Sequence, residues 1–330
     1  MSLRTAILGA TSQLARDLVL SFSLVEPSKA QANPNGHDLE LYARRPDAVR
    51  DWLAGCGLAG RYQVFAMTEL PARGRIDAIL NFVGVGDPAK AAAMGSSIFE
   101  VTHAYDELVL AYLRRHPGTR YFFMSSGAAF GQSFEQPADE YTPARFALNR
   151  LQPQDWYGLS KLHAEARHRS MPELPIIDIR VYNYFSATQD LSARFLATDI
   201  LRAIQQGKVL RTSPDNIMRD FLHPIDFHAL VASLLAAPPS NDVVDAYTRA
   251  PIDKVTLLAE MRARFGLKYD FVSSSAAVNA TGVKPHYYSV NRRAGHYGYI
   301  PAMTSLEGLV DGFSRVLQGA SSGSNSSATS

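Results

Sequence analysis

The stretch ILGATSQLA, residues 7–15, decides how the first part of this chain folds. A mostly apolar run over residues 5–8 leads into Gly9, and a helix-like pattern follows it. Glycine reaches backbone conformations that other residues avoid, so Gly9 predicts a tight turn from a strand into a helix. The first N–H groups of a helix have no partners inside the helix, so this turn also predicts an anion-binding site.

Apolar runs of strand length alternate with helical patterns through the first 180 residues. The helical pattern at 97–115, for example, ends at His116-Pro117-Gly118, a sequence that stops a helix. Such alternation is typical of an α/β protein whose parallel sheet is covered by helices. The predicted strands are 5–8, 39–43, 62–66, 78–83, 121–125 and 176–181.

Beyond residue 181 the pattern becomes irregular and predicts a second, smaller and mostly helical lobe. Its helix candidates are 191–206, 227–236 and 254–265. We expect a first domain of residues 1–180 that also takes in about 216–250, a second lobe of 181–215 and 251–318, an exposed loop at 27–37, and a disordered Ser-rich tail at 319–330.

The composition excludes several classes of protein. The chain has 330 residues, 46% of them hydrophobic and 19% charged, which suits a globular protein with a sizeable core. The net charge of +2 and the scattered basic residues argue against nucleic acid as a partner. No apolar run is long enough to span a membrane, and the single cysteine, Cys56, suits a reducing compartment, so we expect a cytoplasmic protein. We see no metal-ligand spacing, and His163 and His168 are expected on a solvated helix face.

The strongest local signal for chemistry is WYGLSK at residues 156–161. Residues four apart share one face of a helix, so the Lys161 ammonium is expected near the Tyr157 phenol. A nearby cation favours the phenolate and would draw the tyrosine pKa from about 10 toward neutrality, which makes the phenol a usable acid and base. Ser126 ends a predicted strand, and ligands of parallel sheets bind beyond the carboxyl ends of strands, so Ser126 would face the same crevice.

At this point the chain resembles an extended short-chain dehydrogenase/reductase of the nucleotide-sugar epimerase, dehydratase and ketoreductase group. The resemblance implies a Rossmann-type, doubly wound parallel sheet with a smaller C-terminal substrate lobe, and a homodimer formed through two sheet-flanking helices. The matching segments, in order, are the Gly9 turn, SSGAAFG at 125–131, YGLSK at 157–161, IRVYN at 179–183, RDFLHPID at 219–226 and YGYIPAMTSLEGL at 297–309.

The resemblance also implies roles for single residues. Tyr157 would exchange a proton with the substrate hydroxyl or carbonyl, Lys161 would hold the nicotinamide ribose, and Ser126 would steady the reacting oxygen. Asn183 and Arg219 would contact the sugar nucleotide, since a guanidinium pairs well with a diphosphate. The non-functional alternatives are that Asn183 is a turn residue and that Arg219 is a surface charge. Gly127 completes the predicted substrate-binding set.

The turn at residues 7–15 departs from the usual G-x-x-G-x-x-G pattern, because Ser12 and Ala15 stand where the second and third glycines would be. We interpret it as a phosphate cradle with altered packing, in which the Ser12 hydroxyl can itself bind phosphate and Ala15 lets the helix lie close to the sheet. The predicted cofactor-binding residues are Gly9, Thr11, Ser12, Gln13, Leu14, Arg44, Arg45, Val83, Lys161 and Tyr182.

The end of the second strand bears on the choice of cofactor. A carboxylate there suits the ribose hydroxyls of NAD, whereas arginine suits the 2′-phosphate of NADP. Here the strand ends in Arg44 and Arg45, while Glu40 lies too early, so NADP is favoured and NAD is the alternative.

These observations predict an NADP-dependent oxidoreductase that reduces a keto group on a nucleotide-linked sugar, with Tyr157 as proton donor. One alternative is a nucleotide-sugar epimerase that uses the same residues, and a further one is a non-catalytic nucleotide-binding protein. Dehydration is not expected, because Gly127 and Ala128 replace the Asp-Glu pair that dehydratases of this family carry after the serine.

Overall fold

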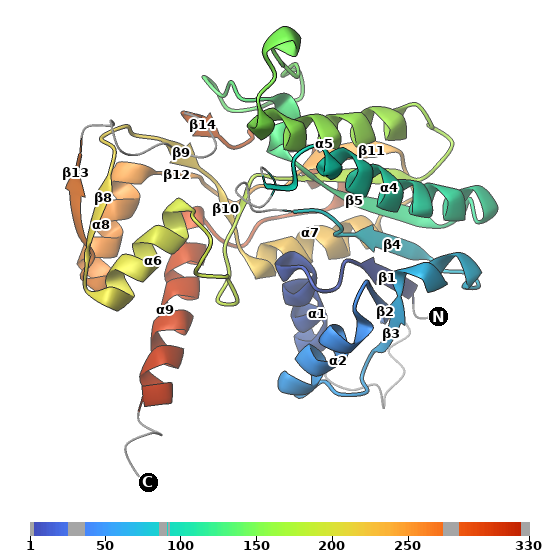
Figure 1. Cartoon of the computed structure of the whole chain (residues 1–330), viewed down its shortest axis with the longest axis horizontal. Coiled ribbons are helices and arrows are strands. Elements are labelled where there is room, and N and C mark those ends of the chain that lie inside the picture. The colour runs from blue at the N-terminus through green and yellow to red at the C-terminus, as the bar shows by residue number, and fades with distance from the viewer. Residues whose placement is uncertain (1–2, 26–36, 86–90, 92, 273–283, 325–330) are drawn as a thin grey trace.

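A parallel sheet of seven strands forms the centre of the molecule (Figure 1). The computed structural model describes residues 3–25, 37–85, 91, 93–272 and 284–324. The strand order is β3-β2-β1-β4-β5-β6-β11, and every neighbouring pair is parallel. This order confirms the predicted doubly wound sheet. The strands are β1 (Leu3–Leu8), β2 (His37–Ala43), β3 (Gln63–Ala66), β4 (Ala78–Asn81), β5 (Arg120–Ser126), β6 (Ile176–Val181) and β11 (Asp242–Asp245).

Helices cover both faces of this sheet, as its two-sided apolar strands require. On one face lie α1 (Gln13–Val25), α2 (Pro46–Gly55) and α7 (Pro224–Ala236), which share one apolar core with the strands. On the other face lie α4 (Ser97–Arg115) and α5 (Pro153–Arg169), which form a second core (Figure 1). The chain changes direction at β1, whose neighbours are β2 and β4, so a ligand crevice is expected beyond the carboxyl ends of β1 and β4.

The later elements gather around a third apolar core. Helices α6 (Leu196–Gln206), α8 (Lys254–Phe265) and α9 (Ser305–Ser324) form most of it. Short strands connect this part to the sheet: β7 (Asn183–Tyr184) pairs with β10 (Phe221–Leu222), β9 (Met218–Arg219) lies between β12 (Ile252–Asp253) and β14 (His286–Tyr287), and β8 (Val209–Thr212) pairs with β13 (Lys268–Phe271). The 3-10 turns are η1 (Met67–Ala72), η2 (Gly127–Phe130), η3 (Leu148–Arg150) and η4 (Arg293–Tyr297).

Two expectations about the chain need correction. The tail was expected to be disordered from residue 319, but α9 continues to Ser324 and points away from the rest of the molecule (Figure 1). Ser-rich composition argues against a packed core, yet a helix that has already formed gains one hydrogen bond for each residue added. The rest of that tail, and residues 27–36 of the expected loop, lie outside the described residues.

The helix expected at 191–206 begins only at Leu196, because side chains hold the preceding segment in turns. Asp190 accepts hydrogen bonds from Ser192, and Thr198 caps the helix start by accepting from the Phe195 N–H.

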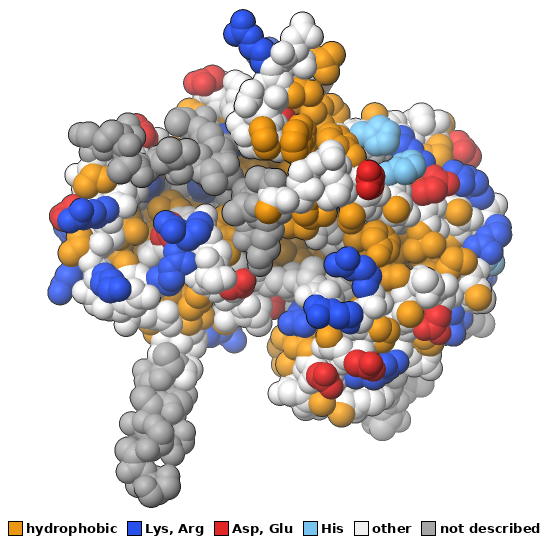
Figure 2. Space-filling view, viewed as in Figure 1, with side chains coloured by type: hydrophobic (Ala, Val, Ile, Leu, Met, Phe, Trp, Pro, Cys, Tyr) orange, Lys and Arg blue, Asp and Glu red, His pale blue; other side chains and the backbone are white. Residues whose placement is uncertain are grey.

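Charged side chains of both signs occur on the face of the molecule that Figure 2 draws. Figure 2 shows basic side chains dispersed among acidic and apolar ones on this face of the molecule. Among the described residues, no helix is both long and apolar enough to cross a bilayer.

Candidate active site

The turn after β1 has the geometry that the sequence predicts. Gly9 has a φ of +78°, and a Cβ there would lie 2.9 Å from the backbone of Phe82 and Val83. Its N–H and that of Ala10 donate to the Tyr42 carbonyl at 3.0 and 3.1 Å. Gly9 is therefore needed both for the turn and for the close approach of the segment after β4.

Ser12 caps the helix that follows this turn. Its N–H donates to the Gly9 carbonyl at 2.8 Å, and its Oγ accepts from the Ala15 N–H at 3.4 Å. The side chain of Ala15 is fully buried in the core beneath the helix, which explains why a small residue stands there. Exposed Thr11 and the first N–H groups of α1, at Gln13 and Leu14, then border the carboxyl edge of the sheet. The altered motif thus keeps first-turn N–H groups that have no partner inside the helix, which is the chemistry an anion site requires.

The Gln13 side chain binds two residues distant in sequence, which the sequence does not reveal. Its Nε2 donates to Ser186 Oγ at 2.8 Å and to Gln189 Oε1 at 3.0 Å. One turn along, buried Asp17 accepts from Tyr184 and Thr188 at 2.8 and 2.7 Å. Helix α1 is therefore tied to the segment after β7, so only the backbone of Gln13 is left for a phosphate.

Arg44 and Arg45 lie exposed at the end of β2, just before α2. Neither forms an ion pair with any residue that the structure describes. Glu40 is 2% exposed and binds Arg4 and Arg73 within the body of the protein. Burial alone would raise the pKa of Glu40, but hydrogen bonds from Arg73, Tyr42 and Arg4 lower it, so its carboxylate is fully engaged.

Ser126, Tyr157 and Lys161 come together beyond the end of β5. Ser126 Oγ accepts from the Ala128 N–H at 3.2 Å, and Ser126 lies near enough to the Tyr157 phenol to lower its pKa. The Lys161 Nζ donates to the Met124 carbonyl at 2.8 Å and lies 5.8 Å from the centre of the Tyr157 ring. The predicted i, i+4 neighbourhood on α5 is therefore present.

The predicted direction of the Tyr157 pKa is wrong for the protein alone. Burial raises the pKa of this phenol, and the Ser126 hydrogen bond offsets that only in part. Burial also lowers the pKa of Lys161 to about 8. The ammonium binds a main-chain carbonyl and lies over the Phe123 ring, 4.4 Å from its centre, so it does not sit at the phenol oxygen.

The predicted substrate residues meet on the other side of Ser126. Asn183 Nδ2 donates to the carbonyls of Asp220 and Tyr287 at 3.3 Å each. Arg219 donates to the carbonyls of Met218 and Lys284 at 2.7 Å each. Both side chains therefore support the backbone around β14.

Gly127 and Tyr182 occupy one small aromatic cluster on this side of the site. A Cβ on Gly127 would overlap the ring of Tyr182, so a glycine is required there. Tyr182 is 8% exposed, and its ring packs edge-on against Phe134 and Tyr287. The side chain of Tyr182 thus lies with the substrate residues, whereas Val83 lies beside the Gly9 turn.

Lys284 and Tyr287 are site residues that the sequence analysis missed. The Tyr287 hydroxyl lies 3.3 Å from Ser126 Oγ, and Lys284 is 6% exposed with its Nζ 4.6 Å from the centre of the Tyr287 ring. Burial, followed by the charge of Arg219, lowers the pKa of Lys284 to about 8. Neither Lys284 nor Arg219 forms an ion pair within the described ranges of the chain, and the charge of Asp155 raises the pKa of Lys284 without such a pair. No spacing in the sequence links 284–287 to the serine, since the two meet only through pairing of β14 with β9.

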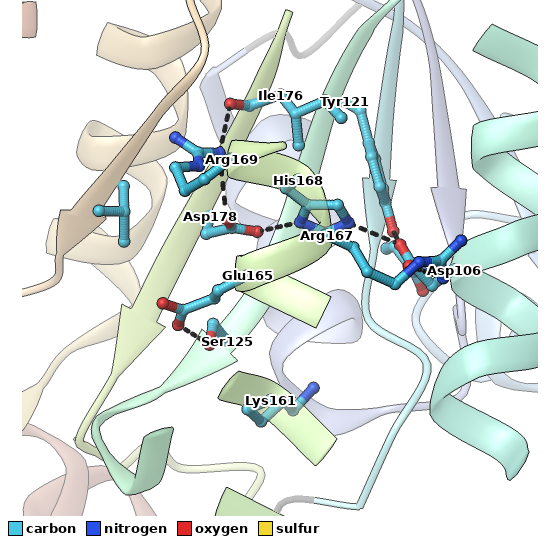
Figure 3. A network of polar contacts seen from close by, with 12 residues as sticks. Asp106, Tyr121, Ser125, Lys161, Glu165, Arg167, His168, Arg169, Ile176 and Asp178 are labelled. Carbon is cyan, nitrogen blue, oxygen red and sulfur yellow. Dashed lines mark hydrogen bonds and ion pairs between the residues drawn. The ribbon is translucent and has the colours of Figure 1, made fainter. Parts of the chain in front are cut away.

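The inward face of α5 carries a buried polar network (Figure 3). His168 is fully buried, with Nδ1 2.6 Å from Asp178 and Nε2 2.8 Å from Asp106, so the expected solvated position is wrong. Burial alone would lower the pKa of His168, but Asp178 and Asp106 raise it to about 9. On the same face, Glu165 binds Ser125. The network fixes the rotation of α5 and hence where Tyr157 and Lys161 point.

The network also reaches the segment next to the Gly9 turn. The Tyr121 hydroxyl donates to Asp106 at 3.0 Å and accepts from Asn81 Nδ2 at 2.9 Å. Asn81 Oδ1 in turn accepts from the Val83 N–H at 2.9 Å. No cluster of metal-ligating side chains occurs among the residues described.

Comparisons with known proteins agree with this architecture. The model of the NAD dependent epimerase/dehydratase family matches residues 30–248, and no curated protein sequence matches the chain. The fold is similar to that of dTDP-glucose 4,6-dehydratase from Bacillus anthracis in complex with NAD, with 12% identity and a TM-score of 0.76 over 97% of this chain and 98% of that one. It is also similar to UDP-glucuronic acid 4-epimerase from Bacillus cereus in complex with UDP-glucuronic acid and NAD, with 12% identity and a TM-score of 0.75 over 96% and 99%.

A third similar structure is UDP-glucose 4-epimerase from Bifidobacterium longum in complex with NAD+ and UDP, with 16% identity and a TM-score of 0.73 over 96% of this chain and 98% of that one. The family match begins beyond the altered Gly9 turn, whereas the structural likeness covers nearly the whole chain.

Proposed function

Because the chain belongs to the NAD-dependent epimerase/dehydratase family, we propose that it reduces a keto group on a nucleotide-linked sugar with NADPH. The observation that carries the proposal is the meeting of Ser126, Tyr157 and Lys161 at the edge of the sheet where the Gly9 turn also lies. A proton donor and a cofactor cradle at one crevice are what carbonyl reduction requires.

Each of the three residues has one task. NADPH, when bound, supplies the hydride that reduces the carbonyl carbon. The Ser126 hydroxyl donates a hydrogen bond to the carbonyl oxygen, and Tyr157 gives that oxygen its proton as negative charge develops there. One N–H of the Lys161 ammonium binds the Met124 carbonyl, and the other two can bind the cofactor ribose. The charge of Lys161 stabilises the phenolate that forms when Tyr157 gives up its proton.

The substrate class follows from two cations, buried Lys284 and half-buried Arg219. Both flank Tyr287 and form no ion pair in the described part of the chain, so a diphosphate of the substrate would supply the paired negative charge. Structures of similar fold contain UDP or UDP-glucuronic acid, which supports a nucleotide sugar. Gly127 and Asn183 would then border the sugar.

For the cofactor we propose NADP rather than the NAD that the similar structures contain. Arg44 and Arg45 are exposed at the strand end and form no ion pairs among the described residues, so they are free to bind a 2′-phosphate. Glu40, the acid nearest in sequence, is occupied by Arg4 and Arg73.

Epimerisation is the second candidate, because two of the three similar structures named above are 4-epimerases. An epimerase oxidises and then re-reduces one sugar carbon with the same residues, and it retains its cofactor. Arg44 and Arg45 favour NADP as the cofactor. An NADP site suits a reductase, which must exchange its cofactor at every turnover, better than an epimerase, which retains its cofactor.

The division of labour belongs to the same proposal. Residues 1–180 with 216–250 would bind the cofactor, and 181–215 with 251–318 would bind the substrate. A homodimer formed through two sheet-flanking helices and a cytoplasmic location complete it; the exposed free Cys56 suits a reducing compartment.

The test is incubation of the full chain with a panel of keto-sugar nucleotides, following NADPH absorbance together with the stereochemistry of the product. Consumption of NADPH with formation of a reduced sugar supports the reductase. If nucleotide sugars without a keto group are added to the panel, inversion at one of their hydroxyl-bearing carbons without net loss of NADPH would replace the reductase by the epimerase. Absence of both reactions would contradict the proposal.

A further inference from the structure

Ser126 has a phenol on each side. Tyr157 from α5 lies near enough for Ser126 to lower its pKa, and the hydroxyl of Tyr287 from β14 lies 3.3 Å from the Ser126 Oγ. Each phenol also has an ammonium beside it: Lys161 Nζ lies 5.8 Å from the Tyr157 ring centre, and Lys284 Nζ lies 4.6 Å from that of Tyr287. The site therefore holds two Tyr–Lys pairs around one serine.

The hydrogen bonds around Ser126 decide where its proton points. A serine hydroxyl has one proton and two lone pairs. The Ala128 N–H occupies one lone pair at 3.2 Å. The Tyr287 hydroxyl lies 3.3 Å from Ser126 Oγ, so the remaining lone pair can accept the Tyr287 proton.

Three neighbours of Tyr287, namely Arg219, Lys284 and Phe134, cannot accept that proton. Arg219 and Lys284 are donors only, and the Phe134 ring packs edge-on with its centre 4.8 Å away. Burial raises the pKa of Tyr287, so its proton is retained at neutral pH. Pairing of β14 with β9 holds the residue opposite Arg219, so the phenol cannot easily turn away.

We infer that Tyr287 is a positioning residue: its hydroxyl donates to Ser126 Oγ and thereby turns the Ser126 proton toward the reacting oxygen. With one lone pair filled by Ala128 and the other by Tyr287, Ser126 can only donate on the side of Tyr157 and the substrate. Without Tyr287, Ser126 would accept the Tyr157 proton that catalysis needs. This inference rests on the proposed function and adds a residue to its machinery.

The kinetic test uses a double-mutant cycle with the keto-sugar nucleotide that the unaltered protein reduces fastest. Tyr287→Phe should lower kcat about ten-fold, the loss of one hydrogen bond, with a smaller change in KM. In a Ser126→Ala background, the same substitution should change the residual kcat by less than about two-fold. Tyr288→Phe is the matched control on the neighbouring residue and should leave kcat unchanged. Equal losses in both backgrounds, or an effect on KM alone, would overturn the inference.

A second measurement needs no substrate. With tyrosine carrying ¹³C at Cζ, the Tyr157 and Tyr287 resonances are assigned by their Phe variants in the full chain. Ser126→Ala should shift the Tyr287 resonance, and Tyr287→Phe should shift that of Tyr157, because both phenols share one hydroxyl. Unmoved resonances would overturn the inference. A protein that reduces none of the panel would refute the proposed function and leave this spectroscopic test intact.

Discussion

At the scale of single residues, burial sets the chemistry of the site. It raises the pKa of Tyr157 and lowers that of Lys161, because each charged form loses water. Spacing along a helix predicted that the two residues would be neighbours, but a spacing contains no information about burial. The direction of the Tyr157 pKa could therefore not be predicted from the sequence.

The exposed arginines give a prediction at this scale. Arg44→Ala and Arg45→Ala should each raise the Kd of NADPH about ten-fold or more and change that of NADH little, since only NADPH has a 2′-phosphate to pair with. The measurement is fluorescence titration with both nucleotides. Arg75→Ala is the control, because this exposed arginine pairs with Asp77. Equal losses for NADPH and NADH would show that the pair is only surface charge.

At the scale of elements, α5 shows how a fold positions a catalytic group. One face of the helix presents Lys161, Glu165 and His168 to the sheet (Figure 3). The sequence correctly predicted the helix and the Tyr157–Lys161 spacing. It did not predict the burial of His168, because the two acids that pair with it, Asp106 and Asp178, come from other elements.

The pH dependence of stability tests this network. The pKa of His168 in the fold, about 9, lies above its ordinary value of 6.5, so its stabilisation is fully present below about pH 6.5 and is lost as pH rises through about 9. The full shift corresponds to about 3 kcal/mol. Urea unfolding at pH 6 and pH 9.5 should show a larger loss of unfolding free energy in the unaltered protein than in His168→Gln.

The control for this experiment is His163→Gln, whose histidine is exposed on the same helix. It should keep the pH dependence of the unaltered protein. The account of the network fails if His168→Gln keeps it too.

At the scale of the whole molecule, the site lies between the sheet and the later part of the chain. The alternating pattern predicted the parallel sheet because the hydrophobic periodicity of each strand and helix can be read from a short stretch of sequence. The short strands β7, β9, β10, β12 and β14 were not predicted, since two-residue strands have no periodicity of their own and exist only through pairing. Lys284 and Tyr287 reach the site through those pairings, which explains why they were missed.

The buried Lys284 predicts opposite effects of one substitution on stability and on ligand binding. The pKa of Lys284 in the fold, about 8, lies below its ordinary 10.5, so its charge destabilises the fold at pH 7, and that cost disappears as pH rises toward 10.5. Lys284→Met should therefore raise the Tm at pH 7 and raise the Kd of UDP about ten-fold, by calorimetry. Lys268→Met, at an exposed lysine of β13, should change neither. Unchanged UDP binding in Lys284→Met would remove the lysine from the substrate site.

The measurement that tests the central claim most directly is hydride transfer from NADPH to the keto-sugar nucleotide by Tyr157→Phe, with Tyr105→Phe as control. The phenol oxygen is the proton donor in this account, so its removal should slow reduction at least about a hundred-fold while the Kd of NADPH stays nearly unchanged. Reduction at the rate of the unaltered protein would contradict the account.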